Sequence, residues 1–466
     1  MGAYETVVGL EIHVELATES KAFCGCSTRF GSAPNTNVCP ACMGLPGGLP
    51  VLNRRVVEFA VKAGLALNCE ITPNARFDRK HYFYPDLPRA IQISQFFMPI
   101  CRNGYVDVPG RRVRIRQIHI EEDAGKLVHD PVTDETLVDF NRCGVPLIEI
   151  VTQPDMRTPE EAVGTVRAIR AALAALEVSD CRMQEGSLRV DVNLSVRPFG
   201  SDTLGTRVEM KNINSFKSIG RAVSGEAARH IECIETGRPL IQQTRRWDDN
   251  KDASFAMRSK EDAHDYRYFP DPDVTPLKLN EEWIEELRAN LPELPEKKRV
   301  RYPLEYGLSA HDTEILVSEK RLSDLFERTA ARCGRPKDAA NWIMGEVLSL
   351  LKERGQAADE LDLDSVKLAR IIELNASGAV NRQAARQTLR VVLDRDADVD
   401  SFIAEQGLSM VDDDGALRAA VSKVIAENPD SVAKYRAGTV KVFGFLVGQA
   451  MRIMAGKSRL PPSLPP

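Results

Sequence analysis

The sequence contains no long hydrophobic segment. Its longest apolar run near the C-terminus, VFGFLVGQAM, is shorter than a bilayer-spanning helix requires and ends at Arg452. The first residues, MGAYETVVGLEIHVEL, alternate between apolar and polar side chains and include acids, so they do not resemble the basic and apolar leader of a secreted protein. These absences exclude a membrane-spanning class, and we expect a soluble, cytoplasmic protein with no membrane partner.

The sequence also lacks an excess of positive charge and the familiar nucleotide-binding motifs. The formal net charge is −5, so any nucleic acid would have to be bound by local basic patches. The motifs GxGxxG, GxSxG and HExxH are absent. The tripeptide GKS at 456–458 ends like a P-loop, but Met451 stands where the first glycine of that motif is needed. Any nucleotide must therefore bind in another way.

The length and the patterning predict several domains and an α+β fold. A chain of 466 residues is too long for a single core. Residues 1–294 are rich in alternating strand patterns, and they show no regular strand–helix alternation of the kind that makes a doubly wound sheet. We therefore predict a largely antiparallel-sheet domain over 1–294, an all-α domain over 295–405 and a small helical tail over 406–466.

Helical patterns in the first domain are expected near 56–67 and from residue 158 onward. At the second helix Thr158 is the predicted N-cap, Pro159 takes the first helical position, and Glu161 closes a capping box. The stretch at 291–305, LPELPEKKRVRYPLE, is dense in proline and charge and is predicted to be a linker. Beyond it the patterns are nearly all helical, until the proline-rich ending RLPPSLPP, which we expect to be disordered.

Four of the ten cysteines are clustered as CGC and CPAC, separated by twelve residues. Tetrahedral Zn²⁺ binds four thiolates at about 2.3 Å, and two tight cysteine pairs on separate turns can supply them. Two unrelated thiol pairs are the alternative. A site with four protein ligands has no open position, so we predict a structural zinc knuckle at 24–42, held by Cys24, Cys26, Cys39 and Cys42.

Acidic residues recur on strands in the first domain. In GLEIHVEL at 9–16, the residues Leu10, Ile12, Val14 and Leu16 alternate with polar ones, which predicts a half-buried strand. A solvated face is the ordinary interpretation of any single acid. Five such segments together favour a shared acidic face that binds Mg²⁺ or Mn²⁺, with a nucleotide phosphate. The polar residues concerned are Glu11 and His13, then Glu121 and Glu122, Glu149, Asp191 and Glu209, whereas Glu15, on the same face of the first strand, has no assigned role.

Two loops mix basic and aromatic residues too densely for a regular element. They are FDRKHYFYPDLPRAIQISQ at 77–95 and the stretch at 244–273, which contains TRRWDD and HDYRYFPDPD. Arg79, Lys80 and Arg89 could hold phosphates, and aromatic rings interleaved with arginine can stack nucleotide bases. An ordinary packed loop with incidental charges is the alternative for each.

These motifs, in this order, closely resemble the B subunits of tRNA-dependent amidotransferases, the GatB family of the GatCAB complex. The resemblance rests on GLEIHVEL, PNTNVCPACMGLPGGLPVLN, FDRKHYFYPDLP, HIEEDAGK, PLIEIV, EGSLRVDVN, VEMKNINSF and HDYRYFPDPD, and it continues through WIMGEVLSLL and YRAGTVKVFGFLVGQAMR. It covers essentially the whole chain. It implies a cradle domain similar to the glutamine synthetase fold, a helical domain and a YqeY-like tail that contacts tRNA.

The resemblance also implies an activity, cofactors and partners. Members of the family use ATP and Mg²⁺ to phosphorylate the side-chain carboxylate of Glu-tRNA(Gln), and often of Asp-tRNA(Asn). Ammonia released from glutamine by the A subunit, an amidase, then displaces the phosphate, and a small C subunit completes the complex. By resemblance, metal and phosphate handling falls to Glu11, His13, Glu122, Asp191 and Glu209, with Glu149 less strongly implied, Lys80 as the phosphate-handling lysine, and the four cysteines as the zinc knuckle.

The sequence departs from the family in one loop, where DLPRAIQISQ replaces the usual DLPKGYQISQ. Arg89 keeps the positive charge on a bulkier planar group, and Ala90 lacks the conformational freedom of glycine. Two other functions are compatible with the residues alone. One is a Mg²⁺-dependent nuclease or phosphohydrolase, and the other is a zinc-stabilised tRNA-binding scaffold without catalysis.

Overall fold

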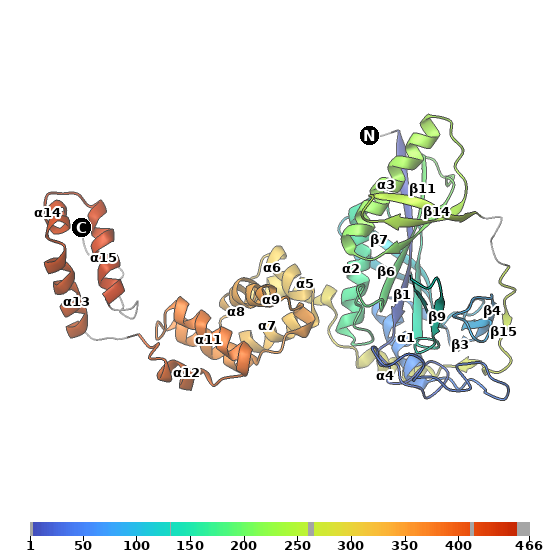
Figure 1. The fold of residues 1–466 in the computed structure, drawn as a ribbon, viewed down its shortest axis with the longest axis horizontal. Coiled ribbons are helices and arrows are strands. Elements are labelled where there is room, and N and C mark those ends of the chain that lie inside the picture. Colours follow the sequence, from blue (N-terminus) through green and yellow to red (C-terminus); the bar gives the residue numbers. More distant parts are fainter. Residues whose placement is uncertain (1–2, 131, 260–264, 411–413, 454–466) are drawn as a thin grey trace. The chain divides into compact units, whose positions relative to one another are not determined.

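A computed structural model describes residues 3–130, 132–259, 265–410 and 414–453. Backbone contacts divide the chain into two compact units, Met1–Pro295 and Glu296–Pro466. Strands dominate the first unit, and the second is helical (Figure 1). The α+β class predicted from the sequence is confirmed.

A nine-stranded sheet organises the first unit, in the order β14-β13-β12-β11-β1-β10-β7-β6-β2. All neighbouring strands are antiparallel except β12 and β13. The strands are β1 (Tyr4–Glu15), β2 (Glu70–Ile71), β6 (Cys101–Val108), β7 (Arg111–Glu122), β10 (Pro146–Thr152), β11 (Leu188–Pro198), β12 (Val208–Ile213), β13 (Gln243–Asp248) and β14 (Ala253–Ser259).

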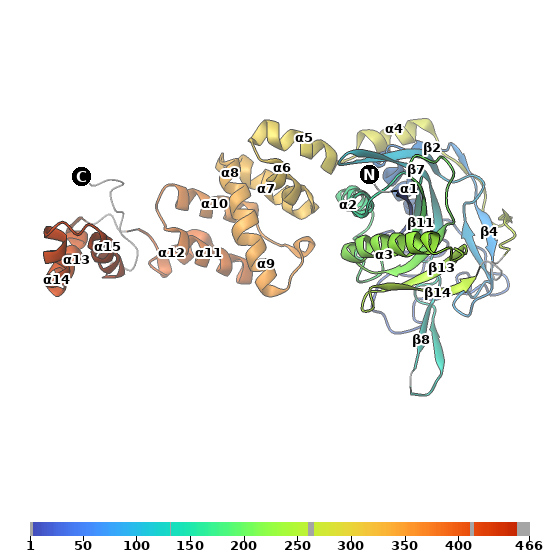
Figure 2. The same cartoon turned by 90° about the horizontal axis from the view of Figure 1, so that it is seen from above.

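Three small sheets accompany the large one. β3 (Asn74–Ala75) pairs with β16 (Leu277–Lys278), and β4 (Asp78–His81) lies between β5 (Ile91–Ser94) and β15 (Phe269–Pro270). β8 (Lys126–His129) and β9 (Thr136–Asp139) form a hairpin that projects from the rest of the unit (Figure 2). The sheet of β4, β5 and β15 brings together the two basic and aromatic loops identified in the sequence.

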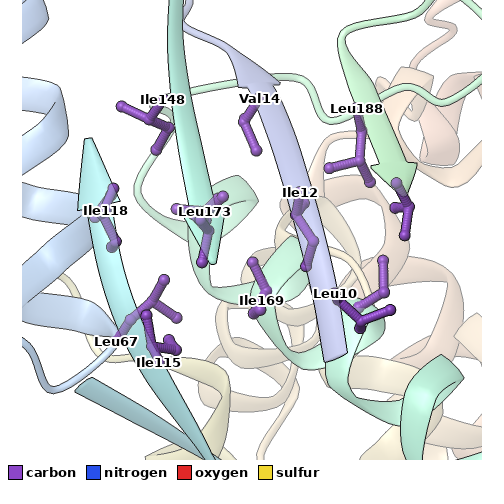
Figure 3. Close-up of a cluster of buried hydrophobic side chains, with 14 of the residues drawn as sticks. Leu10, Ile12, Val14, Leu67, Ile115, Ile118, Ile148, Ile169, Leu173 and Leu188 are labelled. Carbon is purple, nitrogen blue, oxygen red and sulfur yellow. The ribbon is translucent and has the colours of Figure 1, made fainter. Parts of the chain in front are cut away.

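The apolar side of the large sheet is covered by helices. Leu10, Ile12 and Val14 of β1 are buried in one core with Ile169 and Leu173 of α2 (Figure 3). Each fully buried aliphatic side chain of this size contributes about 1.5–3 kcal/mol. Because side chains alternate along a strand, Glu11 and His13 face the opposite side of the sheet. The helices of this unit are α1 (Arg54–Ala66), α2 (Pro159–Ala175), α3 (Phe216–Glu235) and α4 (Glu281–Ala289).

The two helices predicted in the first domain are present as α1 and α2. Thr158 caps α2 by accepting a hydrogen bond from the Glu161 backbone N–H, and Pro159 opens the helix. The reciprocal half of the capping box differs from the prediction. The Glu161 carboxylate accepts from the backbone N–H of Arg157 at 2.7 Å, one residue before the N-cap.

The second unit has its own hydrophobic core, which includes Tyr302, Phe326, Trp342 and Leu389. The linker predicted at 291–305 was wrong from Pro295 onward, because that part is helical. Pro295 suits a first helical turn, the charged residues that follow it are good helix formers, and Pro303 is accommodated inside the helix. The helices are α5 (Pro295–Tyr306), α6 (Ala310–Val317), α7 (Lys320–Cys333), α8 (Pro336–Trp342), α9 (Leu348–Arg354), α10 (Ser365–Ala376), α11 (Arg382–Arg395), α12 (Val399–Glu405), α13 (Asp414–Glu427), α14 (Pro429–Arg436) and α15 (Lys441–Ile453).

α15 contains the apolar run VFGFLVGQAM and packs with α13 and α14. Within the described ranges, no helix combines the length and the apolar character that a bilayer crossing requires. The proline-rich ending at 459–466, for which disorder was expected, lies outside the described residues.

Candidate functional site

Two histidines and two glutamates meet on the polar face of the large sheet. His13 of β1, Glu149 of β10 and His119 of β7 stand directly opposite one another in three neighbouring strands. Glu149 Oε2 lies 3.4 Å from His13 Nε2 and 3.1 Å from His119 Nε2. The carboxylate of Glu121 lies 3.5 Å from His13 Nε2 and 3.6 Å from His119 Nε2. We call these four residues the histidine cluster.

The charges of the histidine cluster depend on one another. Burial alone would lower the pKa of His119, but Glu149 and Glu121 outweigh it and raise that pKa to about 10. The same two glutamates raise the pKa of His13 against the effect of its burial. In return, His119 and His13 hold the pKa of Glu149 well below its usual range, although burial acts to raise it. Burial also acts to raise the pKa of Glu121, but His119 outweighs it and lowers that pKa, so both carboxylates are ionised at neutral pH.

Three further carboxylates gather on the neighbouring strands. Glu11 of β1 stands opposite Asp191 of β11, and Glu209 of β12 lies close enough that one oxygen of each falls within 4.8 Å of the others. Lys211 bridges the last two, with its Nζ 2.8 Å from Asp191 and 2.9 Å from Glu209. Asn193 Nδ2 donates to Glu11 at 2.9 Å. We call Glu11, Asp191 and Glu209 the carboxylate cluster.

Acidic residues of both clusters act on the pKa of Glu11. Burial raises its pKa, and the negative charges of Glu149 and Glu209 raise it further. Such crowding of like charge is relieved by a cation. Ligand oxygens with one imidazole suit Mg²⁺ or Mn²⁺, and His13, Glu121 and Glu149 also offer ligand atoms within 4.8 Å of one another. The donor sets of both clusters therefore fit divalent cations.

Sequence reasoning placed seven residues on one acidic face: Glu11, His13, Glu121, Glu122, Glu149, Asp191 and Glu209. The structure brings all of them except Glu122 into the two clusters. Sequence reasoning missed His119, Lys211 and Asn193. Strand alternation carried the signal for all three. His119 is two residues from Glu121, Asn193 is two from Asp191, and Lys211 is two from Glu209, so each pair lies on one face of its strand.

Glu122 is held differently from Glu121. Its buried carboxylate pairs with Arg89 and accepts a hydrogen bond from the backbone N–H of Ile93 at 3.0 Å. Gln92 Nε2 donates to its backbone carbonyl at 2.7 Å. Burial raises the pKa of Glu122, and Arg89 opposes that rise. Neither described cluster of potential metal ligands contains Glu122, so its role in metal binding stays a prediction.

The loop that carries Arg89 adopts a backbone conformation typical of glycine. Ala90, the residue after Arg89, has a φ of +53°. A residue with a Cβ atom is sterically disfavoured in this left-handed region, because Cβ comes close to the following carbonyl oxygen. The Arg89–Glu122 pair is thus formed on a strained turn.

The two other predicted phosphate ligands have different surroundings. Arg79 is engaged by Asp271, 3.0 Å from its Nε, and by Asp273, 2.6 Å from its Nη2. Lys80 Nζ lies 5.0 Å from the ring centroid of Tyr266 and 5.5 Å from that of Tyr82, and its charge helps to lower the pKa of Glu121. Lys80 is therefore the cation placed toward the histidine cluster, whereas two carboxylates already neutralise Arg79.

The four clustered cysteines converge, with all four Sγ atoms within 4.8 Å of one another. A hydrogen bond from the Cys24 thiol lowers the pKa of Cys42 to about 4, and Lys21 also favours its thiolate from 3.8 Å. Lys21 is completely buried. Four sulfur donors at this spacing fit tetrahedral Zn²⁺.

Glu15, the third polar residue of the opening strand, lies outside both clusters. Its pKa is raised to about 8 by burial and by the neighbouring Asp123, which is itself paired with Arg189 at 2.8 Å. The sequence assigned no role to Glu15, and the two clusters have none for it.

The carboxylates, imidazoles and lysine on the polar face of this mostly antiparallel sheet are a donor set typical of the class of proteins that bind cations and phosphates. Comparison with known proteins narrows this class. Residues 6–285 match the GatB/GatE catalytic domain, and residues 324–461 match the GatB domain of the YqeY type. The chain belongs to the GatB family.

Curated relatives extend over almost the full chain. The B subunit of the aspartyl/glutamyl-tRNA(Asn/Gln) amidotransferase of Lachnoclostridium phytofermentans is 54% identical over 462 residues, which are 98% of this chain and 97% of that protein. The B subunits of the same name from Lachnospira eligens and Agathobacter rectalis are 52% and 50% identical over 98% of this chain and 97% of each relative.

Proposed function

We propose that this protein is the B subunit of a glutamine-hydrolysing, tRNA-dependent amidotransferase. It phosphorylates the side-chain carboxylate of Glu-tRNA(Gln) or Asp-tRNA(Asn) with ATP. The observation that carries the proposal is the presence of two acidic clusters on one face of the large sheet, with Lys211 between two of the carboxylates and the charge of Lys80, from β4, acting on Glu121. Full-length similarity to proteins of this name supports it. The nuclease, phosphohydrolase and scaffold alternatives have no such support.

The chemistry requires a site of this kind. An oxygen of the substrate carboxylate attacks the γ-phosphorus of ATP, the bond to the β-phosphate oxygen breaks, and ADP leaves. Ammonia then attacks the acyl carbon, phosphate departs, and the nitrogen loses a proton to give the amide. Divalent cations, when bound, neutralise charge on the transferred phosphoryl group. His13, Glu121 and Glu149 would hold one cation, and Glu11, Asp191 and Glu209 a second.

The basic side chains near the two clusters have separate roles. Lys80 orients a phosphate beside the histidine cluster, and Lys211 keeps Asp191 and Glu209 in position. Arg89 and Glu122 form a buried pair of opposite charges that holds the segment of Arg89 and Ile93 against the end of β7. The cysteine knuckle holds a structural Zn²⁺ and fixes the loop that follows β1.

The proposal includes partners and a compartment. The A subunit, an amidase, supplies ammonia, a small C subunit completes the heterotrimer, and the misacylated tRNA is the substrate. The complex acts in the cytoplasm, in protein biosynthesis.

The test uses the reconstituted heterotrimer with Glu-tRNA(Gln) and ATP but without glutamine. ADP and a γ-phosphoryl-glutamyl-tRNA are expected to form before ammonia is supplied. Running the same assay with Asp-tRNA(Asn) identifies which substrate is used. Absence of ATP hydrolysis with either tRNA, or cleavage of the tRNA, would overturn the proposal.

A matched pair of variants tests the site itself. Glu11→Gln is expected to abolish amidation while the glutaminase activity of the amidase persists. Glu70→Gln, on the exposed edge strand β2, is the control and should leave both activities unchanged. Loss of amidation through a collapsed melting transition in Glu11→Gln would indicate a structural role instead.

A further inference from the structure

We propose that a strip of aromatic side chains beside the histidine cluster stacks the unpaired nucleobases at the 3′ end of the aminoacyl-tRNA. The inference rests on the proposed function and adds a binding subsite to it. The aromatic strip consists of Tyr84, Tyr82, Tyr266, Tyr268, Phe96 and Phe97.

The six rings form a continuous chain drawn from the two basic and aromatic loops. Tyr82 lies 6.1 Å from Tyr84 and 5.8 Å from Tyr266, measured between ring centroids. Tyr268 follows at 6.0 Å from Tyr266 and stacks on Phe96 at 4.2 Å, with 12° between the ring planes. Phe97 closes the strip at 5.1 Å from Phe96. The segments at 82–84, 96–97 and 266–268 thus present one surface.

Part of this aromatic surface is exposed to water. Phe96 is 52% exposed, Phe97 47% and Tyr84 45%. Phe96 and Phe97 are neighbours at one end of the strip, and Tyr84 lies at its other end, so the exposed rings belong to one connected aromatic surface, which is typical of an interaction site. The half-buried tyrosines between them fix the orientation of the strip.

Cations accompany the rings along the strip. The Arg76 guanidinium lies 5.8 Å from the centroid of Phe97, and Arg102 donates to the Phe97 backbone carbonyl at 2.6 Å. At the other end, Lys80 lies over Tyr82 and Tyr266. Aromatic faces next to cations complement a single strand of RNA, whose bases stack while its phosphates pair with the basic groups.

The strip begins at the proposed site of phosphorylation. Ser94 Oγ lies 3.5 Å from Glu121 Oε2, and Phe96 follows only two residues later, a distance of about 7 Å along an extended chain. The reacting amino acid is esterified to the ribose of the terminal nucleotide. If its side-chain carboxylate is at the histidine cluster, the base of that nucleotide can lie no farther from the cluster than the esterified amino acid and one ribose can span. The aromatic strip occupies that position.

The experiment replaces the terminal adenine of the tRNA by 2-aminopurine, whose fluorescence is quenched when it stacks. Binding of the aminoacylated probe to the wild-type heterotrimer is expected to quench the fluorescence, and Phe96→Ala to relieve the quenching. Because one base–ring stack is worth about 1–3 kcal/mol, KM for the aminoacyl-tRNA should rise about tenfold in Phe96→Ala, with KM for ATP unchanged. Phe96→Tyr should retain both properties.

The matched control is Phe199→Ala, which removes an equally exposed phenylalanine (57%) after β11 and outside the strip. It should leave quenching and KM unchanged. If Phe96→Ala melts at a lower temperature than Phe199→Ala, quenching and KM are measured on Phe97→Ala instead.

Each other outcome overturns the inference. An increase in KM for ATP alone would assign the strip to the adenine of ATP, and failure of the heterotrimer to assemble would make it a protein interface. Unchanged quenching and KM would leave it without a role in binding. A wild-type complex that makes no amide at all is a different result, because it refutes the proposed function and not the subsite alone.

Discussion

Replacing Glu226 by glutamine is expected to destabilise the first unit by about 3 kcal/mol at neutral pH. Glu226 lies on α3 with its carboxylate completely buried. One oxygen lies 2.5 Å from Arg229 Nη2 and 3.2 Å from His230 Nε2. The other accepts from Ser254 Oγ at 2.5 Å and lies 3.7 Å from Arg245 Nε. The residue thereby connects the helix to β13 and β14.

The magnitude follows from the pKa of this carboxyl group. Burial acts to raise the pKa of Glu226, but hydrogen bonds from His230, Arg229 and Ser254 outweigh it and lower the value from 4.5 to about 2. A shift of this size corresponds to about 3.4 kcal/mol of stability. Breaking a buried ion pair by removing one partner costs about 3–5 kcal/mol, which agrees. For a unit of this length, 1 kcal/mol is worth roughly 2 °C, so the melting temperature should fall by about 6 °C.

The pH dependence has a definite sign. Because the folded-state pKa is below the ordinary one, the carboxylate contributes its full stability above pH 4.5 and loses it as the pH falls toward 2. The difference between wild type and Glu226→Gln should therefore shrink to about 1.4 kcal/mol at about pH 3.

Calorimetry or urea unfolding at both pH values measures this difference. Glu232→Gln is the matched control, because Glu232 lies on the same helix and forms an exposed ion pair with Arg238. Exposed pairs contribute at most about 1 kcal/mol. Equal stability of the two variants at neutral pH, or a difference that persists undiminished in acid, would refute the reasoning.

Three further substitutions test the site and its supports. Glu149→Gln removes one of the two carboxylates that His13 and His119 share and should slow formation of the phosphorylated intermediate roughly a hundredfold; a rate within a few-fold of wild type would contradict this role. Cys39→Ser should release about one Zn²⁺ per chain by elemental analysis and lower the melting temperature while ATP binding persists; a wild-type chain without zinc would refute the knuckle. Ala90→Gly should stabilise the first unit by up to about 1 kcal/mol, because glycine adopts positive φ without strain; a lower melting temperature than wild type would show that the turn is not strained.

Alternation along strands made most of the first unit predictable. The period of two in GLEIHVEL put Leu10, Ile12 and Val14 in the core and Glu11 with His13 on the opposite face, as the structure has them. The helix that begins after Thr158 followed from its cap and its apolar stripe. Both patterns are local in sequence, and for that reason they could be recognised without knowledge of the fold.

Contacts between distant segments could not be predicted in the same way. Arg89 and Glu122 are 33 residues apart, and no local pattern predicts that they pair. The aromatic strip joins residues near 82 and 96 to residues near 266, which only the pairing of β15 with β4 brings together. The helix at Pro295 was missed for a different reason. Prolines suggested a linker, but Pro295 opens the helix, and Pro303 lies inside it next to Tyr302, which is buried in the core of the second unit.

The adjacent glutamates of HIEED show why the face of a strand matters more than the identity of a residue. Glu121 and Glu122 have the same chemistry, but consecutive side chains on β7 point to opposite sides of the sheet. Glu121 shares its side with His119 and faces His13, whereas Glu122 meets Arg89 and the backbone of β5. A cation bound by the histidine cluster would therefore contact Glu121, and loss of Glu122 would act through the position of Arg89. Comparing metal affinity in Glu121→Gln and Glu122→Gln separates the two roles, because only the first variant should weaken Mn²⁺ binding directly.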